Sequence, residues 1–98
     1  MKEQHTLIKG YRDLSQEEID LMNRIKAFGP ELEQLCDDLF AYHVKRMNAA
    51  EIMCSEGDSS EYDRIMNAAP GSWCFEGRTH IQQGLMFLIR SVAQPTTF

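Results

Sequence analysis

Apolar residues recur every three or four positions through the middle of the chain, from Leu32 to Ala50. This spacing is typical of one face of a long amphipathic helix, which is predicted to run from Pro30 to about Met53. No segment has the alternating pattern of a strand, so the chain is predicted to be all-α. The apolar positions of the helix are Leu32, Leu35, Cys36, Leu39, Phe40, His43, Met47 and Ala50.

A capping box predicts another helix upstream. Ser15 is followed three residues later by Glu18, and each side chain can accept a hydrogen bond from the backbone N–H of the other residue. Leu14 and Ile19 stand at the positions of a hydrophobic staple around this pair. The helix is therefore predicted to begin at Ser15, after irregular N-terminal residues. It is expected to be interrupted at Gly29-Pro30, because proline inside a helix removes a hydrogen bond and causes a kink.

The rest of the chain is predicted to hold a loop, a short helix and a long last helix. Residues 54–60 are predicted to form the loop. Residues 60–68 suit a short helix that is capped by Ser59 or Ser60. Residues 69–72 contain Pro and Gly and form a second break. The last helix is then expected from residue 72 or 73 to residue 93, with a short tail at 94–98.

The last helix is apolar on two sides. One side can pack against the long middle helix as an antiparallel helical hairpin, and the other side needs a further surface. A chain of this length buries only about two thirds of its unfolded surface, so a homo-oligomer is predicted from a single domain over residues 1–98. The two apolar stripes contain Ile81, Leu85, Leu88 and Val92, and Met86, Ile89 and Ala93.

Composition excludes some partners and compartments. The formal net charge of -5 argues against duplex nucleic acid, which requires an extended basic face, but leaves a small anion possible. Three cysteines without a secretory signal favour reduced thiols in a cytoplasm. No apolar run approaches the roughly 20 residues that are needed to cross a bilayer.

Metal and catalytic motifs are weak. The cysteines and histidines lack the spacing of a zinc site, and His43 falls on an apolar stripe, so neither a metal nor a cofactor is predicted. Glu17, Glu18, Asp37 and Asp38 are superficially similar to the magnesium ligands of all-α nucleotide pyrophosphohydrolases. However, acids are expected in a first helical turn, and the last helix has no second E-x-x-D motif. That enzyme and a helical adaptor for protein partners remain the alternatives.

One aromatic residue and one cation are of interest together. Tyr11 lies just before the predicted helix start, and Lys26 lies about three helical turns further along. A ring can stack on a base and an ammonium group can bind a phosphate, so the pair is the minimum for holding a nucleotide. The residues alone favour the simpler interpretation, in which Tyr11 is an ordinary exposed ring and Lys26 an ordinary surface lysine.

Two blocks at the ends of the chain resemble a known family. The segments GYRDLSQEEIDLMNRIK (10–26) and GRTHIQQGLMFLIRSVAQPTTF (77–98) are similar to the opening and to the last helix and tail of the bacteriophage anti-CBASS sponges. Their helical hairpin is shared with anti-Thoeris sponges. The resemblance implies a homohexamer in the cytoplasm of the infected host. It also implies binding of cyclic di- and trinucleotides such as cyclic GMP–AMP, without cleavage, so that the effector stays inactive.

The resemblance also implies roles for particular residues. Tyr11 would stack on a base and Lys26 would contact a phosphate, with Arg12 beside Tyr11, in a cyclic dinucleotide pocket that two protomers share. A separate pocket would take a cyclic trinucleotide through an arginine and a threonine. The candidates for this second pocket are Arg78, Thr79, Thr96 and Thr97.

Overall fold

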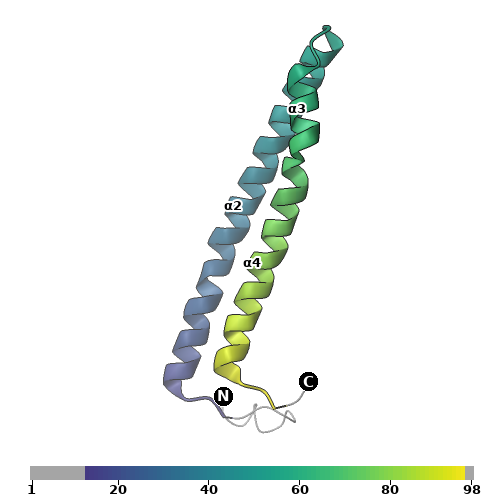
Figure 1. Cartoon of the computed structure of the whole chain (residues 1–98). Helices are drawn as coiled ribbons and strands as arrows, with labels where there is room; N and C mark the ends of the chain where they lie inside the picture. Colours follow the sequence, from purple (N-terminus) through teal and green to yellow (C-terminus); the bar gives the residue numbers. More distant parts are fainter. Residues whose placement is uncertain (1–12, 97–98) are drawn as a thin grey trace. The chain divides into compact units, whose positions relative to one another are not determined.

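The computed structural model describes residues 13–96, and its regular structure is entirely helical over that range. The helices are α2 (Gln16–Ser55), α3 (Ser60–Ala68) and α4 (Pro70–Ala93), shown in Figure 1. The two long helices, α2 and α4, form a hairpin-like arrangement. The predicted all-α class is therefore confirmed.

The start of α2 is the predicted capping box. The backbone N–H of Ser15 donates to Glu18 Oε1 at 2.9 Å, and the backbone N–H of Glu18 donates to Ser15 Oγ at 3.2 Å. Leu14, at the staple position before the cap, is buried. Two of the backbone donors at the helix start are thus satisfied by side chains only three residues apart.

The predicted interruption at Gly29-Pro30 is wrong, because α2 is one helix of 40 residues with Pro30 inside it. Pro30 has no N–H to donate to the carbonyl of Lys26, one turn earlier, which costs about 3 kcal/mol. Nucleating a separate helix is also unfavourable, by a factor of about 10⁻³ or about 4 kcal/mol. Continuing through the proline therefore costs no more than stopping and starting again. A single long helix replaces the separate N-terminal helix that was expected.

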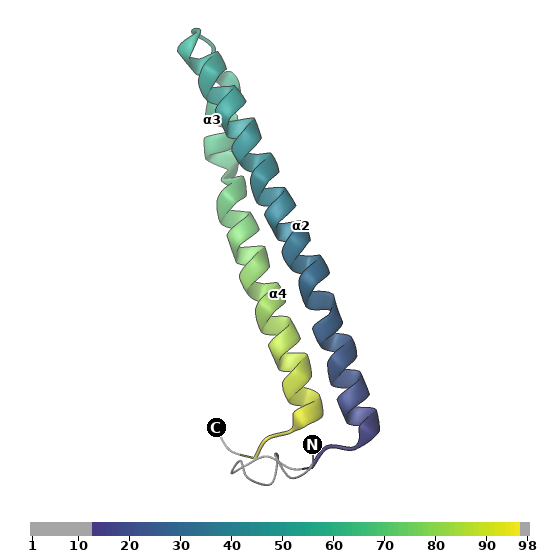
Figure 2. The same ribbon diagram turned by 180° about the vertical axis from the view of Figure 1, so that it is seen from behind.

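The described residues fall into two compact units, and each is considered by itself. The first contains residues 13–31 and 81–96, where the first turns of α2 and the last turns of α4 lie side by side (Figures 1 and 2). Its buried residues are Leu14 and Ala93. The second contains residues 32–80, which include the rest of α2, all of α3 and the start of α4. Its buried residues are Cys36, Ala50 and Ile65.

The short helix α3 has the predicted bounds but a different cap. Ser59 occupies the cap position and makes no capping hydrogen bond; its hydroxyl donates to Asp63 Oδ2 at 3.1 Å. Asp58 Oδ1 instead accepts from the backbone N–H of Ser60 at 3.1 Å and from its hydroxyl at 2.7 Å. These bonds favour the ionised carboxylate, so they lower the pKa of Asp58.

The break between α3 and α4 is shorter than expected. It consists of Ala69 alone, which adopts a left-handed conformation with φ 51° and donates its N–H to the carbonyl of Ile65 at 2.9 Å. Pro70 then begins α4, so the last helix starts before the predicted residue 72. Proline suits a first helical position because the N–H that it lacks would have no partner within the helix.

The helices leave much apolar surface uncovered. The buried residues are mostly small, and none of the described side chains with a large volume is fully buried. Trp73 is 74% exposed and Phe87 is 67% exposed. None of the described helices is both long and apolar enough to cross a membrane. Apolar side chains of this size usually require a covering surface, as the two-sided pattern of the last helix predicted.

Candidate functional site

The residues of the first predicted pocket are described only in part. Tyr11 and Arg12 lie outside the described residues. Lys26 is exposed on α2 in the first unit, and it makes no ion pair within residues 13–96. Its ammonium group is therefore available to an anion. A hollow of about 260 Å³ opens on the same stretch of helix and is lined by Arg24, Ala27, Phe28 and Glu31.

The residues of the second predicted pocket are divided between the units. Arg78 and Thr79 are consecutive residues of α4 in the second unit, whereas Thr96 follows α4 in the first. Thr97 lies outside the described residues. The hydroxyl of Thr79 donates to the carbonyl of Phe75 at 3.0 Å, so this proton is already used within the helix. Within one unit, the structure thus places Arg78 and Thr79 next to each other on α4.

Arg78 of α4 forms a hydrogen-bonded ion pair with Asp37 of α2. Its Nη1 donates to Asp37 Oδ1 at 3.3 Å, and both side chains remain substantially exposed, at 41% and 57%. One turn away, the thiol of Cys74 points to the carbonyl of Cys36 at 4.0 Å. A guanidinium group has five N–H donors, so the bond to Asp37 leaves most of them for a ligand.

A hollow of about 330 Å³ lies beside Arg78 in the second unit. Its lining includes Asp37 and Phe40 from α2, and Cys74 and Phe75 from α4. The rings of Phe40 and Phe75 are exposed. Aromatic faces beside a cation and a carboxylate can hold a base and a phosphate. Of these residues the sequence indicated only Arg78 as a ligand contact. Asp37 and Phe40 are three residues apart, as are Phe75 and Arg78, and this spacing was the sequence signal that each pair shares a helix face.

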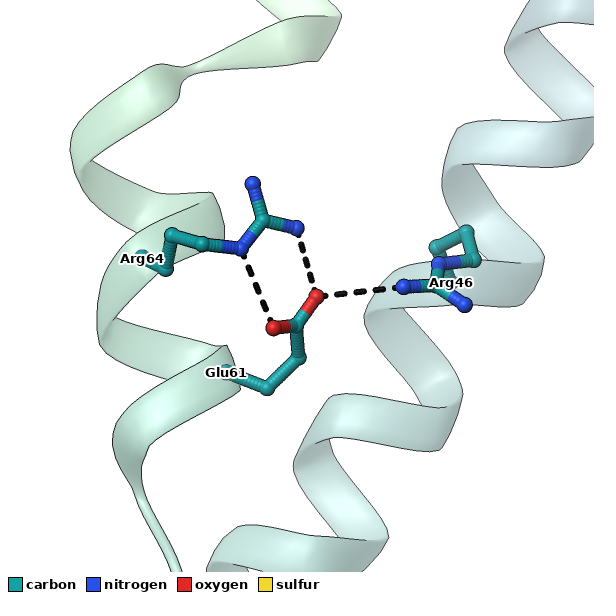
Figure 3. Close-up of polar contacts among 3 residues, drawn as sticks. All are labelled: Arg46, Glu61 and Arg64. Atoms are coloured by element: carbon teal, nitrogen blue, oxygen red, sulfur yellow. Dashed lines mark hydrogen bonds and ion pairs between the residues drawn. The ribbon is translucent and has the colours of Figure 1, made fainter.

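A second charged cluster joins α3 to α2. Glu61 accepts hydrogen bonds from both Arg64 of its own helix and Arg46 of α2, as Figure 3 shows. The distances are 3.0 Å from Arg64 Nε to Oε2 and 3.2 Å from Arg46 Nη2 to Oε1. The hydrogen bond from Arg64 is the main cause of the lowered pKa of Glu61. Both carboxylate oxygens of Glu61 accept hydrogen bonds, so this cluster links α3 to α2 and helps to position α3.

His43, which falls on the apolar stripe of the long helix, is half-buried and lines two hollows of the second unit. One hollow, of about 220 Å³, adjoins Arg46 and Arg64. The other, of about 370 Å³, has no charged residue in its lining, which includes Val44 and Met66. An anion could bind in the hollow beside Arg46 and Arg64 only by competing with Glu61 for these two arginines. The apolar hollow suits an apolar side chain of a partner.

Three of the four acids that were considered as magnesium ligands have other contacts. Glu18 belongs to the capping box, Asp37 pairs with Arg78, and Asp38 Oδ1 accepts from Gln34 Nε2 at 2.9 Å. Within residues 13–96, no three side chains of His, Cys, Asp or Glu converge in a way that would hold a metal ion. Glu18, Asp37 and Asp38 are therefore engaged in the fold or in the hollow beside Arg78.

Similarity to known proteins extends over nearly the whole chain. Residues 3–93 match the family described as "Acb2/Tad1, hairpin domain". The chain is also 42% identical over 108 residues to "Anti-CBASS protein 2" of Pseudomonas phage JBD67, and the match covers 97% of each protein. Both matches include the middle of the sequence, where the resemblance of the end blocks gave no support. This chain therefore belongs to the Acb2/Tad1 hairpin family.

Proposed function

We propose that this protein binds and sequesters cyclic oligonucleotide second messengers of a bacterial immune system without cleaving them. By lowering the free concentration of the messenger in the infected cytoplasm, it blocks activation of the CBASS effector. The observation that carries this proposal is the match along 97% of the chain to a phage protein named for anti-CBASS activity. The hairpin and its exposed cations agree with binding of a small anion.

The first proposed site takes a cyclic dinucleotide through Tyr11, Arg12 and Lys26. A tyrosine ring under a base contributes about 1–3 kcal/mol, and a charge-assisted bond from Lys26 to a phosphate contributes about 1.5–3 kcal/mol. Two protomers of a homohexamer supply each group twice, which suits a ligand with two bases and two phosphates. The exposure of Lys26 and its lack of an ion pair within residues 13–96 support this role.

The second proposed site takes a cyclic trinucleotide through Arg78. The 3.3 Å bond from Arg78 to Asp37 is long and partly exposed, so the guanidinium can turn its other donors to a phosphate. Thr79 can accept a hydrogen bond, because its own proton goes to Phe75. Thr96 and Thr97 complete this proposal from the tail.

Calorimetry with cyclic GMP–AMP, followed by analysis of the bound nucleotide, tests the function. The expected result is tight binding, and chromatography after denaturation in the presence of magnesium should recover the intact ligand. Recovery of a linear product would support the hydrolase alternative instead. If no cyclic di- or trinucleotide binds, the proposal is wrong.

Substitutions should separate the two sites. Lys26→Ala is expected to weaken cyclic dinucleotide binding and spare cyclic trinucleotides, and Arg78→Ala is expected to do the reverse. Lys45→Ala, which removes the same charge from an exposed position of α2, is the matched control and should change neither affinity. Equal losses with both ligands in the two site variants would contradict separate pockets. A protein adaptor, in contrast, would keep its function in every one of these variants.

A further inference from the structure

We infer that the hollow beside Arg78 is a guanine-selective subsite, in which Asp37 recognises the base and Phe40 and Phe75 hold it by stacking. This inference rests on the proposed function and adds a base preference to it. It also assigns roles to three residues that the sequence did not indicate as ligand contacts.

The subsite lies within one compact unit and takes one ring and one charge from each of two helices. Asp37 and Phe40 are three residues apart on α2, and Phe75 and Arg78 are three residues apart on α4, so each pair shares a helix face. The 3.3 Å bond from Arg78 to Asp37 joins the two faces. The hollow of about 330 Å³ falls within the range of roughly 300–1,000 Å³ that is usual for small-molecule sites.

The two rings are largely exposed. Phe40 is 59% exposed and Phe75 is 68% exposed, although both line the hollow. An aromatic side chain normally buries a large apolar area, so rings left open around a cavity are available to stack on a planar ligand. Stacking is tolerant of sequence, because every base has a π-face. The rings therefore account for binding of a base, and another group must select which base.

Asp37 supplies that selection. An ionised carboxylate only accepts hydrogen bonds, and the Watson–Crick edge of guanine offers two adjacent donors, N1–H and the 2-amino group. Adenine offers one donor beside an acceptor, which the carboxylate repels. Within residues 13–96 the bond to Arg78 Nη1 is the polar contact of Asp37, and it uses Oδ1. Oδ2 thus remains available for the bidentate contact when the base replaces or shares this bond.

The neighbouring charged cluster shows why the inference is specific to this hollow. Glu61 also faces arginines, but both of its oxygens accept hydrogen bonds from Arg64 and one also accepts from Arg46. A base would have to break three bonds there. At Asp37 it meets a single bond of 3.3 Å between partly exposed groups.

The direct test compares two cyclic trinucleotides that differ in one base, cyclic AMP–AMP–GMP and cyclic tri-AMP, by calorimetry on the full chain. The wild-type protein is expected to prefer the guanine-containing ligand by about 5- to 150-fold, which is the discrimination of one good bidentate contact. Asp37→Asn should bring the affinity for this ligand down to that for cyclic tri-AMP. The matched control is Asp38→Asn, with the same charge change at the next residue, whose polar contact is Gln34. It should keep the preference.

A third ligand isolates the proposed contact. Cyclic AMP–AMP–IMP lacks the 2-amino group, so it should bind the wild-type protein with an affinity between those of the other two ligands. Phe40→Leu and Phe75→Leu should weaken all three ligands by similar factors, because stacking does not select the base. Circular dichroism of every variant checks that the helices are retained.

The outcomes separate this inference from the proposed function. If the wild-type protein binds both trinucleotides with equal affinity, sequestration stands and guanine selectivity is overturned. The same conclusion follows if Asp37→Asn and Asp38→Asn behave alike. If the wild-type protein binds neither trinucleotide but still binds cyclic dinucleotides, the site at Arg78 is overturned together with its selectivity.

Discussion

Ser15 and Ser59 both precede a helix, but only the hydroxyl of Ser15 accepts a hydrogen bond from a backbone N–H of the helix that it begins. Ser15→Ala is therefore expected to lower the free energy of unfolding by about 0.5–2 kcal/mol, the usual cost of losing a cap. Ser59→Ala should have a smaller effect, because the backbone N–H of Ser60 bonds to Asp58 instead. Urea unfolding of both variants measures the difference. Equal destabilisation would contradict the assignment of the cap to Asp58.

Glu61 makes stability depend on pH. Hydrogen bonding to Arg64 lowers the pKa of Glu61 below its ordinary value of 4.5. The folded state thus favours the ionised form, and the resulting stabilisation is fully present above pH 4.5 and is lost as the pH falls through the lowered pKa. Glu61→Gln should therefore lose less of its unfolding free energy than the wild-type protein does on acidification below this pH.

A double-mutant comparison identifies the partner that causes this dependence. Arg64→Gln alone should also flatten the acid dependence, because its hydrogen bond is the largest cause of the lowered pKa of Glu61. Added to Glu61→Gln, it should change the slope no further. Urea unfolding at a series of pH values measures each slope. An acid dependence that is identical in the wild type and in Glu61→Gln would contradict the role of Glu61.

At the scale of the elements, two glycines distinguish helix from turn. Gly29 lies inside α2 and Gly57 lies in the turn after it, and a Cβ atom at either position would meet nothing within 4 Å. Gly29→Ala should therefore raise the free energy of unfolding by about 0.5–1 kcal/mol, the helix propensity difference. Gly57→Ala should lower it, because Gly57 has a φ of 104°, which strains an L-residue. Thermal unfolding compares the two. Destabilisation by Gly29→Ala would contradict a helix that is continuous through Gly29, and stabilisation by Gly57→Ala would contradict the strain expected at Gly57.

Local signals predicted the elements well where one interaction dominates. The capping box placed the start of α2, and the start of α3 and the end of α4 were also predicted correctly. The effect of Pro30 was predicted wrongly. The free-energy cost of the proline is local, whereas the cost of nucleating a second helix and the continuing apolar face favour one helix over the whole segment. The cap of α3 was missed because aspartate and serine compete for the same backbone N–H, and only the turn geometry decides between them.

The site was predicted less completely than the fold. Arg78 came from the resemblance of the last helix, but Asp37 and Phe40 lie about 40 positions earlier in the chain. Each pair could be assigned to one helix face from its own spacing. The alignment of one helix against the other depends on packing within the second unit, including the short helix that separates α2 from α4. The roles of Tyr11, Arg12 and the threonines of the tail remain predictions.

At the scale of the whole molecule, the uncovered apolar side chains agree with the proposed homo-oligomer. Phe87 lies on α4 with Met86 and Leu88, and all three are more than half exposed. Burying one phenylalanine contributes about 1.5–3 kcal/mol, and a symmetric assembly gains this in every copy. The wild-type protein is therefore expected to sediment at a multiple of its 11.3 kDa chain mass, with six copies as the proposed number.

Phe87→Glu tests whether this surface carries the assembly. A buried carboxylate without a partner is strongly unfavourable, so the variant should sediment as a smaller species at micromolar concentration while its helical circular dichroism persists. Gln82→Glu introduces the same charge at an exposed position of α4 that is five residues away and thus on another face, and it should leave the mass unchanged. If Phe87→Glu keeps the wild-type mass, Phe87 lies outside the interface. If the wild-type protein is itself a monomer, the proposed dinucleotide pocket shared by two protomers fails with the hexamer, because Lys26 of one copy would have no second copy to complete the site.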